Sequence, residues 1–240
     1  MKPNAVSLAL LGVAAAGALG TLALRADPGG AAATTGRLTV VELFQSQGCS
    51  DCPPAETNLN AVAGRPDVLA LSYGVTYWDR LGWKDSFATP RFTARQWEYA
   101  RRRNRNQVWT PQVFIDGQAD LVGADRAQFD RAIQASRVTG PGVAIGRGRA
   151  TVAAGPAPAR PATVWLVRYD PRTLDVAIRA GENGGRTLPH RNIVRELTRL
   201  GDWNGRAASF ALPAAALPGL ATAVLVQDGP GGAILGAAKG

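Results

Sequence analysis

Residues 47–54 have the sequence Gln47-Gly48-Cys49-Ser50-Asp51-Cys52-Pro53-Pro54, and they hold the only two cysteines of the 240-residue chain. The apolar run before them, residues 38–44, predicts a buried strand, and residues 55–62 after them predict a helix. A strand, a Cys-x-x-Cys turn and a helix N-terminus form the arrangement of thiol–disulfide redox proteins. Since no third cysteine exists, the two sulfurs react either with each other or with a partner molecule.

The positions of the two thiols predict a different role for each. A thiolate near a helix N-terminus is stabilised by free amide groups and by the helix dipole. We therefore expect Cys49 to attack a substrate disulfide and Cys52 to resolve the mixed disulfide. Because proline is tolerated only where a helix amide lacks an intrahelical partner, Pro54 can be no later than the third helical position. Asp51 or Cys52 is then the earliest N-cap, and Asp51 opposes thiolate formation unless its carboxylate caps the helix.

Strands and helices alternate in the first half of the chain. After the first strand and helix, the patterns predict a buried strand at 67–75, a helix at 89–103, hairpin strands at 112–115 and 119–122, and an amphipathic helix at 125–137. Asp116-Gly117 between the hairpin strands is a strong two-residue turn signal. This order predicts an α/β fold, with a thioredoxin-like domain at residues 37–139 whose mixed sheet is flanked by helices.

Thr110-Pro111 directly precedes the strand expected at residues 112–115. Thioredoxin-like folds place a cis-proline at this point, beside the cysteine loop, where the backbone of the preceding residue can pair with a substrate chain. Although proline is also common at the start of an ordinary strand, its combination with the upstream Cys-x-x-Cys favours a cis bond. We therefore expect Thr110 and Pro111 to position the substrate.

The second half of the chain has a different composition. A shift occurs near residues 139–142, and a Pro/Ala/Gly stretch at 153–161 predicts a loop. From Ala162 on, short strand signals are separated by glycine and proline, at 163–168, 174–178, 193–197, 207–212, 221–226 and 233–235. These signals predict a smaller β-rich domain at residues 140–240.

The N-terminal segment predicts export. Lys2 precedes an apolar run over residues 6–24 with small-residue cleavage sites beyond it, which is typical of a secretory signal. We expect residues 1–33 to be a signal peptide or an uncleaved signal anchor, and only an anchor would make a membrane a partner. The mature chain is then periplasmic or extracellular, where disulfides persist.

Charge does not indicate a nucleic-acid partner. The formal net charge is +9, but most of the positive charge is arginine scattered through both halves. The basic cluster at residues 101–105 ends a predicted helix, where cations favour the helix dipole. No known nucleic-acid-binding module accompanies this charge.

Three separated motifs resemble the DUF1223 family, a group of exported thioredoxin-like proteins of unassigned function. They are Val41-Glu42-Leu43-Phe44 running into the cysteine motif, Tyr77-Trp78-Asp79-Arg80-Leu81-Gly82-Trp83-Lys84-Asp85, and Gly181-Glu182-Asn183-Gly184-Gly185-Arg186-Thr187-Leu188-Pro189-His190. The resemblance implies a thioredoxin-like fold with a β-rich C-terminal part and no established substrate. The family commonly has a His and an Asp before the Tyr-Trp-Asp motif, where this chain has Gly74 and Thr76. A proton-shuttling role for that pair is therefore not expected in this member.

Three functions remain open at this point. The first is an exported thiol–disulfide oxidoreductase that exchanges with a protein or small-molecule disulfide or thiol and needs no cofactor. The second is a copper or zinc metallochaperone, in which His190, the only histidine, would complete a site with Cys49 and Cys52. The third is a binding module with a static disulfide.

The glycine-rich segment of the second half offers a further candidate site. Its members are Glu182, Asn183, Arg186 and His190. A functional role is as much expected for them as a structural role, in which Glu182, Asn183 and Arg186 form an ion pair and turn caps and His190 is a structural hydrogen-bonding group. Trp78, Trp83 and Trp109 lie in segments near the predicted redox face, where they would form an apolar wall or pack into the core.

Overall fold

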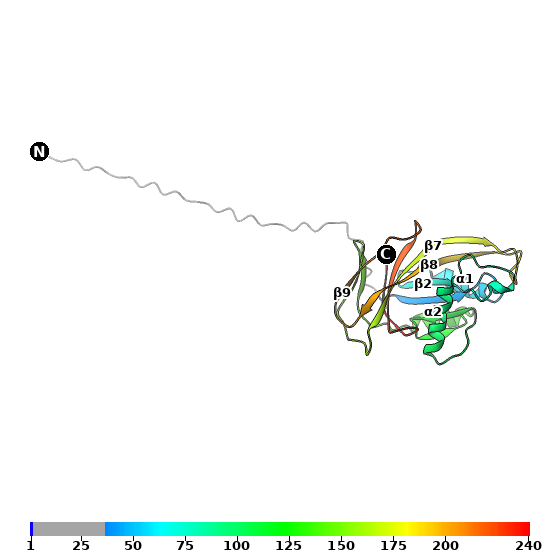
Figure 1. Ribbon diagram of the computed structural model, residues 1–240, viewed down its shortest axis with the longest axis horizontal. Coiled ribbons are helices and arrows are strands. Elements are labelled where there is room, and N and C mark those ends of the chain that lie inside the picture. The colour runs from blue at the N-terminus through cyan, green and yellow to red at the C-terminus, as the bar shows by residue number, and fades with distance from the viewer. Residues whose placement is uncertain (2–36) are drawn as a thin grey trace.

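The computed structural model describes Met1 and residues 37–240 (Figure 1). Apart from Met1, the predicted signal segment, residues 1–33, lies outside the described residues. Within the described part, none of the helices has both the length and the apolar character needed to cross a membrane.

The described chain contains three α-helices, one 3-10 turn and eleven strands. The helices are α1 Cys52–Val62, α2 Pro90–Arg102 and α3 Arg126–Gln134, and the 3-10 turn is η1 Asp79–Leu81. The strands of the first half are β1 Thr39–Gln45, β2 Val68–Gly74, β3 Gln112–Ile115 and β4 Ala119–Leu121. The strands of the second half are β5 Val143–Gly146, β6 Arg149–Val152, β7 Ala162–Ala177, β8 Thr187–Trp203, β9 Ala208–Ala211, β10 Ala221–Gln227 and β11 Ile234–Lys239.

Eight strands form one mixed sheet in the order β11-β10-β7-β8-β2-β1-β3-β4. β1 pairs with β2 in parallel and with β3 in antiparallel orientation, and β3 pairs with β4 as a hairpin. Ser72 of β2 pairs with Ile193 of β8, so the sheet runs without interruption from the first half of the chain into the second. Strands β5, β6 and β9 form a separate three-stranded sheet.

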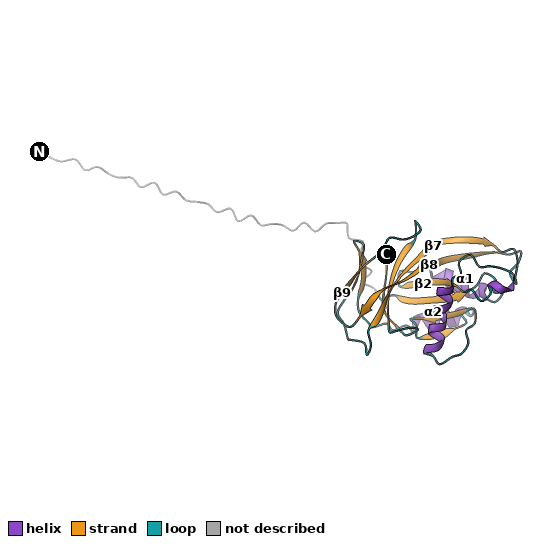
Figure 2. Cartoon of the chain, in the orientation of Figure 1, coloured by secondary structure: helices purple, strands orange, loops and turns teal. Residues whose placement is uncertain are grey.

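Helices cover both faces of the first half of the large sheet. Apolar residues of α1 and α3, among them Leu59 and Phe129, pack on one face of β1, β2 and β3. Phe92 and Tyr99 of α2 pack on the other face, in a cluster that also contains residues of β7, β8 and β10. Figure 2 shows the helices gathered at one end of the molecule and the three-stranded sheet at the other.

A buried ion pair connects α2 to both halves of the sheet. Arg95 of α2 donates from Nε to Glu42 Oε1 of β1 at 2.7 Å and from Nη1 to Gln227 Oε1 of β10 at 3.2 Å. The Tyr99 hydroxyl also donates to Glu42. Arg95 and Glu42 are 2 % and 0 % exposed, so their charges are compensated inside the protein rather than by water.

The local predictions for the first half are confirmed. Thr89 caps α2 by accepting a hydrogen bond from Phe92 N, and Pro90 occupies the first helical position. Asp125 caps α3 in the same way through Gln128 N at 2.8 Å. Asp116 and Gly117 both adopt positive φ between β3 and β4, with a hydrogen bond from Gln118 N to Ile115 O. The loop between the assigned strands is residues 116–118, the same three residues that the predicted strand bounds left between the strands.

The strand boundaries predicted for the second half are partly wrong. The separate strands expected at 163–168 and 174–178 are one 16-residue strand, β7, which passes Asp170 and Pro171 with an irregular register against β8. The expected strand at 193–197 is the middle of the 17-residue β8. Two strands, β5 and β6, form in residues 143–152, where none was expected. The division into domains at residues 139 and 140 stays a prediction.

Candidate functional site

Cys49 and Cys52 form a disulfide at the start of α1, with their Cα atoms 5.4 Å apart. Cys49 lies in the cysteine loop, residues 46–51, which connects β1 to α1, whereas Cys52 is the first residue of α1. Two backbone hydrogen bonds between residues three apart shape this loop. They run from Cys49 N to Ser46 O at 3.1 Å and from Cys52 N to Cys49 O at 3.2 Å. The expectation that Cys49 precedes the helix is confirmed.

Asp51 is the N-cap residue of α1, as predicted, but its side chain makes no capping hydrogen bond. Pro53 and Pro54 follow in the first turn, where their missing amides leave no intrahelical bond unmade. The exposed Asp51 side chain, which lies between the two cysteines in the sequence, is therefore not engaged in capping, and a carboxylate at this place opposes formation of a thiolate.

The Thr110-Pro111 bond is cis, as predicted. Gln112 pairs with Phe44 of β1, so Pro111 lies next to the end of the strand from which the cysteine loop emerges. Trp78 connects the two segments. Its indole Nε1 donates to Thr110 Oγ1 at 2.7 Å, and its Cβ lies close enough to Gly48 for van der Waals contact with an added Cβ, at 3.9 Å.

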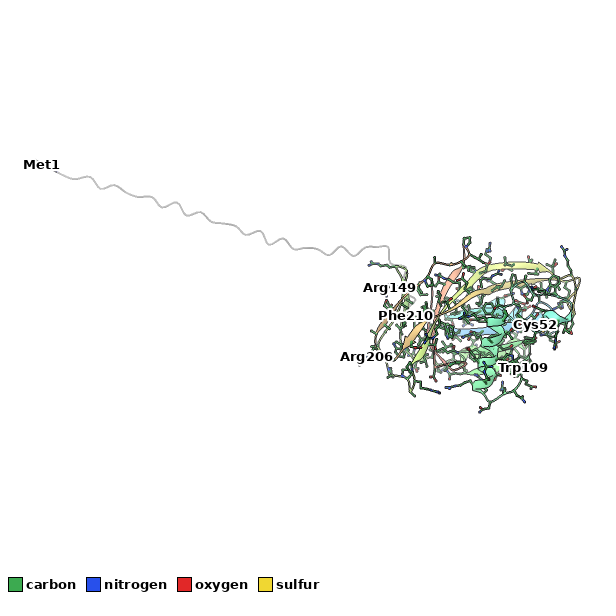
Figure 3. All side chains as sticks on the ribbon, viewed as in Figure 1. Met1, Cys52, Trp109, Arg149, Arg206 and Phe210 are labelled. Carbon is green, nitrogen blue, oxygen red and sulfur yellow. A yellow bond between two sulfur atoms is a disulfide. The ribbon has the colours of Figure 1, made fainter. Side chains whose placement is uncertain are left out.

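The other two tryptophans named from the sequence are partly buried and have separate neighbours. Trp83 donates from Nε1 to Gln47 Oε1 at 2.9 Å, which places it against the cysteine loop. Trp109 instead lies under the Arg105 guanidinium, whose Cζ is 5.4 Å from the ring centroid. Figure 3 shows Cys52 and Trp109 in the half that holds the helices, far from Arg149 and Phe210 of the three-stranded sheet.

Residues 180–186, here called the strap, join β7 to β8 and lie on the cysteine loop. The fully buried Asn183 donates from Nδ2 to two backbone carbonyls of that loop, Gln47 O at 2.9 Å and Cys49 O at 2.8 Å. Arg186 Nη1 donates to Asn183 Oδ1 at 2.6 Å and so holds the amide in place. The structure therefore brings Asn183 against the Cys49 backbone and places Arg186 behind it.

Glu182 adds a second contact between the strap and the cysteine loop. Its Oε2 accepts hydrogen bonds from Ser50 Oγ at 2.7 Å and from Ser50 N at 3.1 Å. These two bonds lower the pKa of the exposed Glu182 carboxyl. The strap thus binds the backbone or side chain of three cysteine-loop residues.

His190, the fourth candidate of that group, does not join the strap contacts. It lies on β8 and is fully buried, with Nδ1 2.6 Å from Glu56 Oε1 on α1 and with no hydrogen-bond partner at Nε2. Burial lowers the pKa of His190, but the Glu56 carboxylate and its hydrogen bond, with Asp85 and Asp175, raise it above its ordinary value overall. Burial raises the pKa of Glu56.

Glu56 and Asp85 are site residues that the sequence analysis did not single out. Glu56 lies one helical turn after Cys52, on the buried face of α1, and this i, i+4 spacing was the available signal. Asp85 Oδ2 accepts a hydrogen bond from Gln47 N at 2.8 Å, and Oδ1 accepts one from Phe87 N at 2.8 Å. Burial raises the pKa of Asp85. Three buried ionisable side chains thus lie beneath the cysteine loop and the start of α1.

Both cysteines are buried, each with 1 % of its surface exposed. His190 pairs with Glu56 rather than with the sulfurs. Within the described part of the chain, no three His, Cys, Asp or Glu side chains are grouped so as to hold a metal ion. The arrangement offers a buried disulfide whose loop is held by hydrogen bonds with Trp83, with Asp85 and with the strap.

The comparisons with known proteins identify the family and leave the activity open. A family model described as a protein of unknown function (DUF1223) matches residues 40–227. A crystal structure of a protein from Agrobacterium tumefaciens is similar, with 30 % sequence identity, a TM-score of 0.71, and coverage of 85 % of this chain and 94 % of that one.

HBP35 of Porphyromonas gingivalis has a similar fold at 13 % identity, with a TM-score of 0.56 and coverage of 85 % of this chain and 75 % of that one. No curated protein sequence matches the chain significantly. The family match spans most of the chain, including the cysteine loop, the Trp78 segment and the strap. The chain therefore belongs to the DUF1223 family of proteins of unknown function.

Proposed function

We propose that the protein is an exported thiol–disulfide oxidoreductase that exchanges with a protein or small-molecule disulfide or thiol. The observation that carries the proposal is the placement of the disulfide. Cys49 lies in a loop ahead of α1, Cys52 is the first residue of the helix, and Trp78, which donates to Thr110 Oγ1, lies near Gly48 of the loop. The strand order β2-β1-β3-β4 with Pro111 beside the end of β1 supports a thioredoxin-like interpretation of this half.

The proposed exchange balances in two steps. In the reduced protein, the Cys49 thiolate attacks one sulfur of a partner disulfide, a mixed disulfide forms, and the other partner sulfur leaves as a thiolate that takes up a proton. Cys52 then loses its proton and attacks Cys49 Sγ, which re-forms the Cys49–Cys52 bond and releases the second partner thiolate. The protein is oxidised by two electrons and the partner disulfide is reduced by two.

Single-cysteine variants test this proposal with oxidised glutathione as the partner. We expect reduced Cys52→Ser to accumulate a mixed disulfide at Cys49, detected by intact mass, faster than Cys49→Ser does at Cys52. The unfolded variants in denaturant supply the control for intrinsic thiol reactivity. The proposal fails if the two folded variants react equally fast, or if neither forms a mixed disulfide.

A static disulfide is the second candidate, and one observation favours it. Both cysteines are 1 % exposed, whereas an attacking thiolate must reach a sulfur atom. In this case the disulfide would hold the cysteine loop on α1 and the strap would complete its cover. The reduction potential separates the two candidates, because structural disulfides resist reduction by glutathione.

A further inference from the structure

The strap, residues 180–186, is the feature of the second half that contacts the cysteine loop most directly. Building on the exchange function proposed above, we propose that the strap is a gate over the disulfide. In the closed state described here, Cys49 and Cys52 are covered. A donor thiolate reaches Cys49 only after the strap has left the cysteine loop.

The strap is anchored at one buried residue. Asn183 is 0 % exposed, whereas Glu182 and Arg186 on either side of it are exposed. The Asn183 amide donates to the carbonyls of Gln47 and Cys49, so removal of the amide frees both residues from the strap at once. Glu182 supplies the remaining bonds, through Ser50.

The strap is built as a small unit that can separate from the loop. Its own backbone bonds run from Gly184 N to Gly181 O at 3.1 Å and from Arg186 N to Asn183 O at 3.1 Å, and these do not involve the cysteine loop. Gly181 and Gly185 have φ values of +75° and +83°, in the region that glycine adopts without strain. Ile178 N donates to Arg186 O at 2.9 Å and Gly185 N donates to Ile178 O at 2.8 Å, so the two ends of the strap are joined and it moves away from the cysteine loop as one unit.

Opening the strap exposes little apolar surface. Within the described chain, none of the three apolar clusters includes a strap residue. The contacts with the cysteine loop are hydrogen bonds, which water can replace at small net cost once both partners are hydrated. Local openings of this kind need far less free energy than global unfolding. The Gly181 backbone lies close to Trp83, because a Cβ added at Gly181 would be 3.2 Å from Trp83 Cβ.

The rate of reduction by dithiothreitol measures access to the disulfide. In this reaction, one thiolate of dithiothreitol attacks Cys49 Sγ, the Cys49–Cys52 bond breaks, and Cys52 leaves as a thiolate that takes up a proton. The second thiol of the reagent then closes its own ring and releases the Cys49 thiol. We expect Asn183→Ala to be reduced about tenfold faster than the wild type, since two buried hydrogen bonds are lost. Glu182→Gln should be reduced faster by a smaller factor.

Asn58→Ala is the matched control. Asn58 is a buried asparagine of α1 that also donates to two backbone carbonyls, Gly123 O at 2.8 Å and Ala124 O at 3.0 Å, but it does not touch the strap. We expect its reduction rate to equal that of the wild type. The gate is overturned if Asn183→Ala is reduced at the wild-type rate, or if Asn58→Ala is accelerated to the same extent.

A replacement variant and a separate assay keep the test decisive. If Asn183→Ala does not fold, Glu182→Gln replaces it, because that exposed side chain can be changed without burying an unpaired group. An unchanged reduction rate for Glu182→Gln then contradicts the gate. Failure of the proposed function is seen separately, as absence of a mixed disulfide between glutathione and the single-cysteine variants.

Discussion

Asn183 donates its side-chain amide to the backbone carbonyl of Cys49 at 2.8 Å, across 134 residues of sequence. Asn183 belongs to the strap, which is the tip of the long β7–β8 hairpin. Strand β8 pairs with β2 in the large sheet. The cysteine loop is therefore completed by the second half of the chain. Glu182 and Asn183, which hydrogen-bond to this loop, lie outside residues 37–139.

Arg95→Leu should strongly destabilise the fold. It removes the partner of the buried Glu42 carboxylate and also the contact with Gln227, and an unpaired buried charge costs about 3–5 kcal/mol. The free energy of unfolding, measured by urea denaturation with the disulfide intact, should fall by about this amount.

Arg126→Ala is the control for that substitution. Arg126 forms an i, i+4 pair with Asp130 at 2.7 Å, but its side chain is 50 % exposed, and such pairs contribute about 0–1 kcal/mol. A loss of stability in Arg95→Leu no larger than that in Arg126→Ala would contradict the role given to the buried ion pair.

His190 should make the stability depend on pH. The Glu56 carboxylate and its hydrogen bond, with Asp85 and Asp175, outweigh burial and raise the pKa of His190 in the folded protein. The folded state then binds the proton more tightly than the unfolded state, in which the histidine has a pKa of about 6.5. This stabilisation is complete below that pH and is lost as the pH rises through the folded pKa. Burial raises the pKa of Glu56, which favours proton binding in the same direction.

His190→Gln tests this dependence. The difference in free energy of unfolding between the wild type and His190→Gln should shrink as the pH rises from about 6 to about 9. Urea denaturation at several pH values measures it. A difference that stays constant over this range, or grows with pH, would show that the pKa of His190 is not raised in the folded protein.

Gly117→Ala should weaken the contact between the β3–β4 turn and the turn before β11. Gly117 has a φ of +63°, and an added Cβ would collide with the carbonyl of Gly232 and approach Tyr99 Cε1 at 3.3 Å. Gly148→Ala is the control, because Gly148 has a φ of +70° but no atom within 4 Å of an added Cβ. Both variants carry the conformational cost of positive φ.

Thermal unfolding measures the difference between these glycines. We expect the melting temperature of Gly117→Ala to fall further than that of Gly148→Ala. Equal shifts would mean that the two turns are not packed together as described.

The sequence was most informative where structure depends on neighbours in the chain. The placement of Cys49 ahead of α1 followed from Pro54, and the start of α2 followed from Thr89 and Pro90. The long β7 was mispredicted because Asp170-Pro171 is a turn signal, yet Arg172 bonds to the Asp170 carboxylate and the strand continues past it.

Long-range contacts explain what the sequence could not supply. The motif containing Asn183 was recognised, but nothing local indicates that its amide binds the carbonyl of Cys49. The pairing of His190 with Glu56 depends likewise on the register of β8 against the rest of the sheet. Both cysteines are buried, and the Cys-x-x-Cys motif itself does not indicate this burial.

The reduction potential of the Cys49–Cys52 pair tests the central claim most directly. Equilibration of the protein with glutathione buffers, followed by quantification of free thiols, gives its value. An exchange-active pair should have a potential above about −300 mV, so that it exchanges with the glutathione pool. A potential below about −300 mV would contradict the proposed oxidoreductase and assign the disulfide a purely structural role.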